Sequence, residues 1–149
     1  MDLSTIVGAR GAAVVFVANG CPTARAYEGR LNDLARSARP RGINFVAINS
    51  NNAALSPPDA EAEMSRRTYD FPYLKDPDGA LAKRFGAVCT PHAFLVDPDM
   101  RVVYDGRIDD SRVGDRITSH DLEDAIGDLV AGREVSVPHT EPFGCSIVW

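Results

Sequence analysis

Unbroken apolar runs alternate with amphipathic segments along the chain. The first run, residues 12–18, is typical of a central β-strand that is covered on both faces. Pro22 follows, and proline suits the first position of a helix because the N–H that it lacks would have no partner there. Apolar residues then recur every three or four positions as far as Pro40 and Gly42, which predicts one amphipathic helix from Pro22 to residue 38.

The remaining pattern continues this alternation. It predicts a strand at 43–48, a helix from 56 to about 69, a short strand at 71–74, one or two helical turns at 79–85, a β-hairpin with strands at 92–97 and 101–105, and a helix at 121–131. An alternating half with parallel strands, followed by a hairpin and a closing helix, predicts an α/β protein with a mixed β-sheet and helices on both faces. This order of elements is the topology of the thioredoxin fold.

The chain has no internal repeat, low-complexity stretch or linker, so residues 1–149 are predicted to form a single domain. Residues 132–149 form a tail that is too apolar to be free, and we expect it to dock on the sheet or the helices. The run 12–18 is far below the ~20 apolar residues that span a bilayer. Its upstream flank carries Asp2 and only one arginine, unlike a signal peptide, so we expect a cytoplasmic protein.

Charge and cysteine content narrow the function classes. The chain has 16 Lys and Arg against 21 Asp and Glu, a formal charge of −5. An acidic chain without a basic tract attracts neither phosphate backbones nor anionic headgroups, which argues against binding to nucleic acids or membranes. Three cysteines are too few for a disulfide framework, and their spacing relative to the histidines matches no zinc pattern. We predict neither a metal nor a cofactor, and the pattern leaves the oligomeric state open.

Chemically reactive and polar residues gather at one predicted edge of the sheet. The carboxyl ends of the two parallel strands and the ends of the hairpin bring together Asn19, Gly20, Cys21, Asn49, Cys89, Thr90, Pro91 and Arg107. Cys21 is expected to be the N-cap of a helix, where free amide groups lower the pKa of a thiol from ~8.5 to ~3.5–7.5. The alternative is a buried cysteine that only packs the strand end. Its position at a strand-to-helix turn favours a reactive thiol.

Seven short segments, spread over the whole chain, carry a family resemblance. They are residues 18–22 (Ala-Asn-Gly-Cys-Pro), 26–28, 46–51, 71–74, 85–91, 106–110 and 144–147. The chain resembles the peroxiredoxin-like, AhpC/TSA-type redox proteins of the thioredoxin fold, whose active-site segment commonly reads Cys-Asn-His-Cys-Pro. The resemblance implies this fold and a cis peptide bond before Pro91, beside the reactive thiol.

Two departures from the family pattern bear on the chemistry. The first active-site cysteine of the family falls on Ala18, and Cys21 matches the second, which aligns with the peroxidatic cysteine of true peroxiredoxins. Those enzymes also carry a threonine and an arginine, at the positions of Ala18 and Pro91, that orient peroxide and stabilise its breaking O–O bond. We therefore expect peroxidase activity to be weak. Arg107 is a candidate substitute; the alternative is a structural arginine paired with the aspartate at 109 or 110.

The leading hypothesis is a thiol-based redox protein, either a thiol-disulfide oxidoreductase or a weak thiol peroxidase with an antioxidant role. Cys21 attacks a disulfide or a peroxide, Cys89 or Cys145 resolves the product, and an external reductant completes the cycle. A substrate chain is expected to add to the sheet edge in a groove formed by Asn19, Gly20, Pro22, Asn49, Thr90 and Pro91. The alternative is a non-catalytic binding module with this fold that has lost turnover with the cysteine replaced by Ala18.

Overall fold

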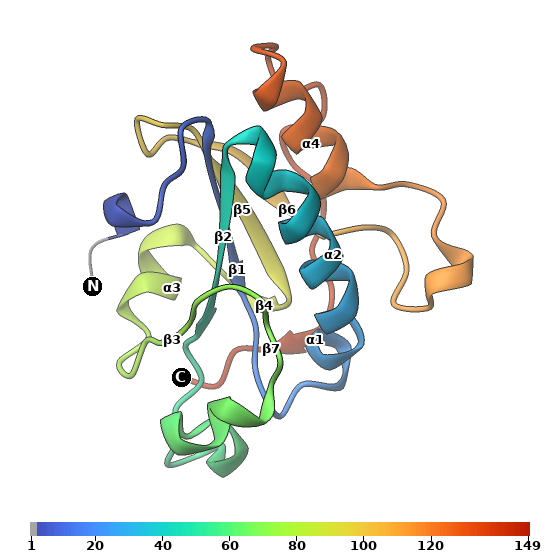
Figure 1. Cartoon of the computed structure of the whole chain (residues 1–149). Helices are drawn as coiled ribbons and strands as arrows, with labels where there is room; N and C mark the ends of the chain where they lie inside the picture. Colours follow the sequence, from blue (N-terminus) through green and yellow to red (C-terminus); the bar gives the residue numbers. More distant parts are fainter. Residues whose placement is uncertain (1–2) are drawn as a thin grey trace.

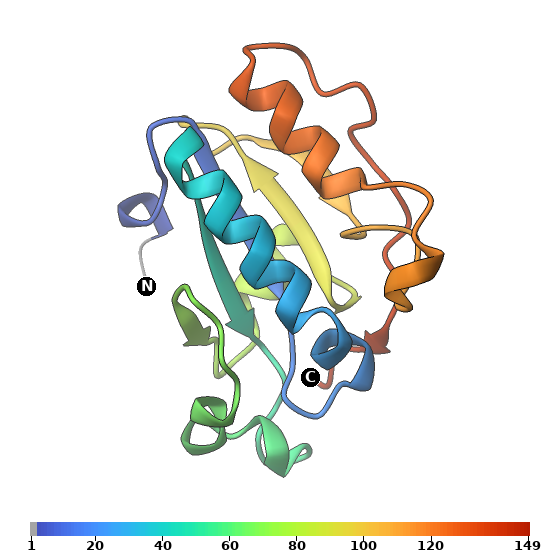
Figure 2. The same cartoon turned by 45° about the vertical axis from the view of Figure 1, so that its right-hand side comes forward.

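In residues 3–149, which the computed structural model describes, five strands form one mixed sheet in the order β3-β2-β1-β5-β6 (Figures 1 and 2). They are β1 (Gly11–Phe16), β2 (Ile43–Asn49), β3 (Tyr73–Lys75), β5 (His92–Val96) and β6 (Val102–Gly106). β2 runs parallel to its neighbours β1 and β3, whereas β5 is antiparallel to β1 and to β6. The parallel half and the hairpin are those that the hydrophobic pattern predicts.

Helices cover both faces of the sheet. They are α1 (Pro22–Ala26), α2 (Glu28–Ala38), α3 (Ala80–Phe85) and α4 (Asp121–Val130), with 3-10 helices at Leu3–Thr5, Arg39–Arg41, Pro57–Asp59, Glu61–Arg66 and Gly114–Arg116. Figure 1 shows α2 and α4 on one face and α3 on the other. No helix within residues 3–149 is long and apolar enough to cross a membrane.

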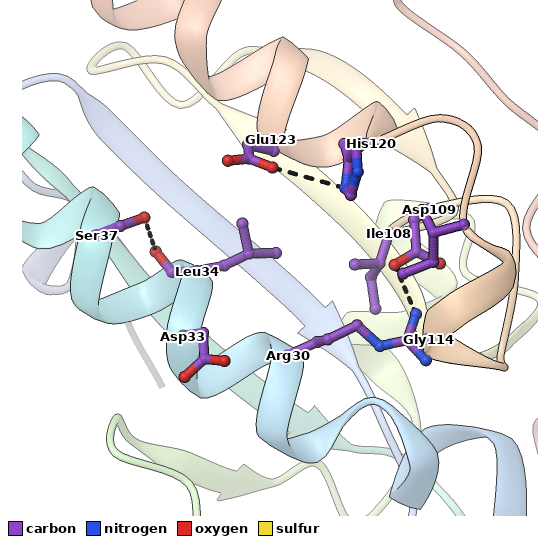
Figure 3. Close-up of a pocket in the computed structure, with 10 residues that line it drawn as sticks. Arg30, Asp33, Leu34, Ser37, Ile108, Asp109, Gly114, His120 and Glu123 are labelled. Atoms are coloured by element: carbon purple, nitrogen blue, oxygen red, sulfur yellow. Dashed lines mark hydrogen bonds and ion pairs between the residues drawn. The ribbon is translucent and has the colours of Figure 1, made fainter.

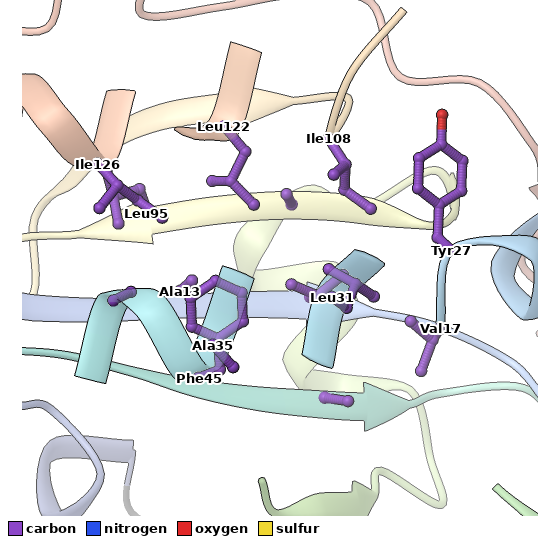
Figure 4. Packing of buried hydrophobic residues seen from close by; sticks show 14 of the residues in the cluster. Ala13, Val17, Tyr27, Leu31, Ala35, Phe45, Leu95, Ile108, Leu122 and Ile126 are labelled. Carbon is purple, nitrogen blue, oxygen red and sulfur yellow. The ribbon is translucent and has the colours of Figure 1, made fainter. Parts of the chain in front are cut away.

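The hydrophobic core has one part on each face. On the first face, Ala13 and Leu95 of the sheet pack against Leu31 of α2 and against Leu122 and Ile126 of α4 (Figure 4). The cluster on the opposite face includes Phe16, Ile48, Ala82, Phe94 and, from the tail, Ile147. All six residues of β1 are buried. A strand covered on both faces has no solvent-facing positions to fill with polar residues, which explains its unbroken apolar sequence.

Two predicted helices differ from the structure. The helix predicted from Pro22 to residue 38 is divided at Tyr27, which ends α1 and precedes α2. The helix predicted from 56 to about 69 is wrong, because this stretch forms two short 3-10 helices. Met64 is the only buried apolar side chain of those two helices, so the stretch lacks the apolar stripe that would hold an α-helix against the sheet.

Candidate active site

Cys21 lies where the chain leaves β1 and enters α1, and it is the N-cap of that helix. Its backbone is extended, and its Sγ accepts a hydrogen bond from the N–H of Ala24 at 3.3 Å. In the thiol form, Sγ also donates to the carbonyl oxygen of Thr90 at 3.2 Å. The Thr90–Pro91 peptide bond is cis, as the resemblance implies. Cys21 is only 2% exposed, and these two hydrogen bonds hold its sulfur between two separate segments of backbone.

A two-stranded sheet brings the tail to this thiol. β4 (Cys89–Thr90) pairs antiparallel with β7 (Cys145–Ser146), with Thr90 opposite Cys145 and Cys89 opposite Ser146. This register places Cys145 opposite the residue whose carbonyl oxygen contacts Cys21 Sγ, so the two cysteines are neighbours. All three cysteines are free thiols.

The pKa values of the three thiols are shifted in different directions by their surroundings. Burial opposes ionisation of Cys21, but hydrogen bonds from the side chains of Cys145 and Thr90 and from the backbone N–H groups of Ala24 and Cys145 outweigh it and lower the pKa of Cys21. Burial, together with the hydrogen bond and charge of Cys21, raises the pKa of Cys145. Burial, followed by the charges of Cys21 and Cys145, raises the pKa of Cys89 to about 11. Cys21 is therefore the thiol that ionises first.

A buried carboxylate fixes the loop before Cys21. Asp59 has no exposed surface. Its oxygens accept hydrogen bonds from the backbone N–H of Asn19 at 2.6 Å and Gly20 at 3.2 Å, from the side-chain amides of Asn49 and Asn51 at 3.0 Å each, and from the Ser56 hydroxyl at 2.5 Å. Burial raises the pKa of Asp59, but these hydrogen bonds outweigh burial and lower it. The carboxylate is charged, and it ties the segment after β2 to the turn that carries Cys21.

The sequence pattern did not reveal the role of Asp59, because this residue falls within the helix predicted from 56 to about 69. The available signal was the polar run 49–51 directly after a buried strand, since amide groups placed there need an acceptor. Lys75 completes the cluster by donating to the carbonyl oxygens of Asn51 at 2.6 Å and Asp59 at 2.7 Å.

The residues predicted to form a substrate groove fall into two groups. Asn19 and Asn49 are buried and belong to the Asp59 cluster, where the Tyr73 hydroxyl donates to Asn19 Oδ1 at 2.8 Å. Gly20 and Pro22 are exposed beside Cys21. Thr90 and Pro91 are buried, and the backbone of Thr90 is paired with that of Cys145. The predicted edge for a substrate strand is therefore occupied by the tail of the same chain.

Arg107 is engaged away from the thiols. Its Nε donates to the carboxylate of Asp121 at 2.7 Å, and its backbone N–H donates to Thr140 Oγ1 at 3.0 Å. This ion pair joins the end of β6 to the first residue of α4. The alternative partners, the aspartates at 109 and 110, were wrong: Tyr27 and Arg30 bind Asp109, and the segment 118–119 binds Asp110. The side chain that follows, Ile108, is buried in the core, and so the chain turns Arg107 toward α4.

A cavity of about 520 Å³ lies between α2 and α4, and Cys21 is not among the residues that line it (Figure 3). Leu34 and Ile108 point into it from opposite sides. The charge of Arg30 at its rim is neutralised by Asp109 at 2.7 Å. No cysteine lines this cavity.

Comparison with known proteins fits this geometry. The AhpC/TSA family profile matches residues 1–105. The chain belongs to the AhpC/TSA family. Cys21, Cys89 and the cis proline lie within the matched residues, whereas Cys145 lies outside them. A search of the curated proteins finds no match.

Solved structures establish the fold. An uncharacterized conserved protein from Geobacillus kaustophilus has a TM-score of 0.90 and 35% identity, with 99% of this chain and 81% of that chain covered. A thioredoxin-like protein in its oxidised form has a TM-score of 0.67 and 16% identity, with 90% and 86% covered. A secreted Mycobacterium tuberculosis disulfide oxidoreductase homologous to E. coli DsbE has a TM-score of 0.58 and 18% identity, with 89% and 87% covered. The predicted thioredoxin fold, with its mixed sheet and helices on both faces, is confirmed.

Proposed function

We propose that this AhpC/TSA-family protein is a thiol oxidoreductase in which Cys21 is the nucleophile and Cys145 the resolving thiol. The observation that carries the proposal is the Thr90–Cys145 strand pair, which places Cys145 beside Cys21, since Cys21 Sγ contacts the carbonyl oxygen of Thr90 at 3.2 Å. Hydrogen bonds from a helix N-terminus and a pKa lowered from the ordinary thiol value, both found at Cys21, are typical of a reactive cysteine. Cys89 is the weaker candidate for the resolving thiol, because it is buried and its pKa is raised to about 11.

With a peroxide, the reaction takes two steps. The Cys21 thiolate attacks one peroxide oxygen, the O–O bond breaks, and the departing alkoxide or hydroxide takes a proton and leaves as alcohol or water. The Cys145 sulfur then attacks the Cys21 sulfenic acid, which forms the Cys21–Cys145 disulfide and releases water. An external thiol reductant supplies two electrons and two protons to restore both thiols.

With a disulfide, the first step differs. The thiolate attacks one sulfur of the substrate, which forms a mixed disulfide and releases the other sulfur as a thiolate. The Cys145 thiolate then attacks the Cys21 sulfur, which forms the Cys21–Cys145 disulfide and releases the second half of the substrate as a thiolate. Neither Ala18 nor Pro91 has a side chain that donates a hydrogen bond to a peroxide oxygen, so the peroxidase rate is expected to be low relative to enzymes that carry those donors.

The test is mass-spectrometric mapping of the full chain after one equivalent of hydrogen peroxide. A Cys21–Cys145 disulfide is expected in the wild-type protein and in Cys89→Ser. In Cys145→Ser, a Cys21 sulfenate should accumulate and be trapped by dimedone. If Cys21 stays unmodified in all three proteins, the non-catalytic binding module replaces this proposal. A Cys21–Cys89 disulfide would reassign the resolving thiol. That the protein acts in the cytoplasm as an antioxidant stays a prediction.

A further inference from the structure

The last seven residues of the chain, 143–149, cross the edge of the molecule that carries Cys21; we refer to them as the tail strap. Figures 1 and 2 show this segment passing beside α1 and pairing with β4. Its anchors lie on both sides of Cys145.

The two residues before Cys145, Phe143 and Gly144, contact residues that lie close to Cys21. The ring of Phe143 packs edge-on against Tyr27, which is buried at the junction of α1 and α2, with 6.3 Å between the ring centroids. Gly144 has φ +150°, and a Cβ added there would overlap the carbonyl oxygen of Thr90. Glycine is therefore required for the backbone of the strap to approach the backbone of Thr90 so closely.

The anchors after Cys145 are apolar and polar. Ile147 is only 6% exposed and belongs to the core cluster on the α3 face. The N–H of Val148 donates to Asn51 Oδ1 at 2.9 Å, and its carbonyl oxygen accepts from the N–H of Asn52 at 2.7 Å. The Nζ of Lys83 lies over the Trp149 ring, 5.3 Å from its centroid.

Through these contacts the tail strap is bound to the edge of β4 in the way that a peptide strand would be. An extended peptide that adds to this edge needs the backbone N–H and C=O of Thr90, and the strap already pairs with Thr90. It also needs a place for a side chain two residues beyond its cysteine, and Ile147 fills that place. The tail strap thus holds the position, direction and apolar anchor that a peptide substrate would use.

We propose that the tail strap is an intramolecular ligand of the strand-docking edge at Thr90, and that the docked protein therefore accepts small peroxides as oxidants and excludes peptide disulfides. This inference rests on the proposed function and adds its substrate class. Peroxide has the size of a few water molecules and reaches a nearly buried sulfur through small fluctuations, whereas a peptide reaches it only after the strap detaches. Once the Cys21–Cys145 disulfide forms, the strap is held covalently at the same edge.

The test uses Cys145→Ser as the background. Serine is similar in size to cysteine but cannot form the disulfide, so any effect of the tail strap comes from its binding at the Thr90 edge and not from disulfide formation. Gly144→Ala in this background detaches the strap, because the added Cβ meets the Thr90 carbonyl. Gly114→Ala is the matched control, since a Cβ there meets nothing within 4 Å. Ile147→Ser, which removes the apolar anchor, is the second detaching variant. Thermal melting by circular dichroism verifies that each variant is folded.

Two probes are compared at equal pH. The first is a synthetic peptide of residues 141–149 whose cysteine is linked to thionitrobenzoate; Cys21 attacks the peptide sulfur, forms a mixed disulfide and releases thionitrobenzoate. The second is hydrogen peroxide, followed by mass-spectrometric loss of the free Cys21 thiol. Because the rate scales with the fraction of open protein, we expect the detaching variants to react with the peptide about tenfold faster than the control. Their peroxide rates should stay within about threefold of the control's, because peroxide needs no detachment.

Equal peptide rates in the control and in both detaching variants would overturn the inference while leaving the proposed function intact. A peroxide rate that rises as much as the peptide rate would also overturn it, because the strap would then shield Cys21 from every oxidant. A Cys21 that reacts with neither probe in any variant would refute the proposed function itself.

Discussion

Replacing Asp59 with alanine tests whether this buried carboxylate positions the nucleophile. The change removes the acceptor of five hydrogen bonds, two of them from the backbone N–H groups of Asn19 and Gly20. The two backbone donors are fixed in the turn before Cys21 and cannot rotate toward another acceptor. A buried donor left without a partner costs ~1–3 kcal/mol, so we expect Asp59→Ala to lower the free energy of unfolding by about 3–5 kcal/mol.

The measurement is urea denaturation of reduced protein, followed by far-ultraviolet circular dichroism. Asp33→Ala is the control, since Asp33 is exposed and pairs only with exposed Arg36 across one helical turn, a contact worth ~0–1 kcal/mol. The rate at which Cys21 is alkylated should also differ between folded Asp59→Ala and wild type. The variant no longer holds the backbone N–H groups of Asn19 and Gly20, which fix the turn before Cys21. A loss of less than about 1 kcal/mol would refute the reasoning, since it would mean that the loop donors find other partners at little cost.

The pH dependence of Asp59 has a definite sign. Its pKa is lower in the folded protein than in the unfolded chain, because hydrogen bonds to the charged form outweigh burial. Its contribution to stability is therefore complete above the ordinary pKa of a carboxyl group and is lost as the pH falls through the lowered value. The stability difference between wild type and Asp59→Ala should narrow on acidification.

Three further predictions concern the tail and the thiols. Cys145→Ala removes a hydrogen bond that helps to offset burial at Cys21, so the pKa of Cys21 should rise in pH-dependent alkylation; an unchanged pKa would contradict the contact. Cys21→Ser removes the Cys21 thiolate, whose hydrogen bond and negative charge raise the pKa of Cys145. The pKa of Cys145 should therefore be lower in this variant than in reduced wild type. The pKa of His139 is raised by its hydrogen bond to Asp105, so its stabilisation is present below the ordinary histidine pKa and lost as the pH rises through the raised value. His139→Ala should therefore melt earlier than wild type in acidic buffer and together with it in alkaline buffer; a gap that widens with pH would contradict this.

The elements with strong periodicity could be predicted from sequence, and those that depend on distant contacts could not. The apolar run before Cys21 and the proline after it predict a strand, a turn and a helix start, which together place this thiol as an N-cap. β7 has two residues and no periodicity, and it exists only because Thr90 offers a strand edge to Cys145. Hence the tail could be predicted to dock, but its register could not.

The candidate site follows the same division. Strand order brings the residues of several loops to one edge, so a site there follows from topology alone. Which residues act and which support them depends on side-chain direction. Asn49 was predicted to face substrate and instead donates to the buried Asp59, while Arg107 was predicted to converge with the thiols and instead pairs with Asp121. Polar residues at a predicted site edge serve its support as readily as its chemistry.

The coupling between Cys21 and Cys145 gives the proposed cycle an order. While Cys21 is a thiolate, its charge and hydrogen bond raise the pKa of Cys145 above the value set by burial, so Cys145 stays protonated and stabilises the thiolate by donating to it. Oxidation of Cys21 to a neutral sulfenic acid removes that charge, and the pKa of Cys145 then falls toward the value that burial alone sets. Cys145 therefore becomes a better nucleophile only after Cys21 has reacted, because the thiolate is the attacking species. The same thiol that lowers the pKa of the nucleophile is thus released to resolve it at the step where resolution is needed.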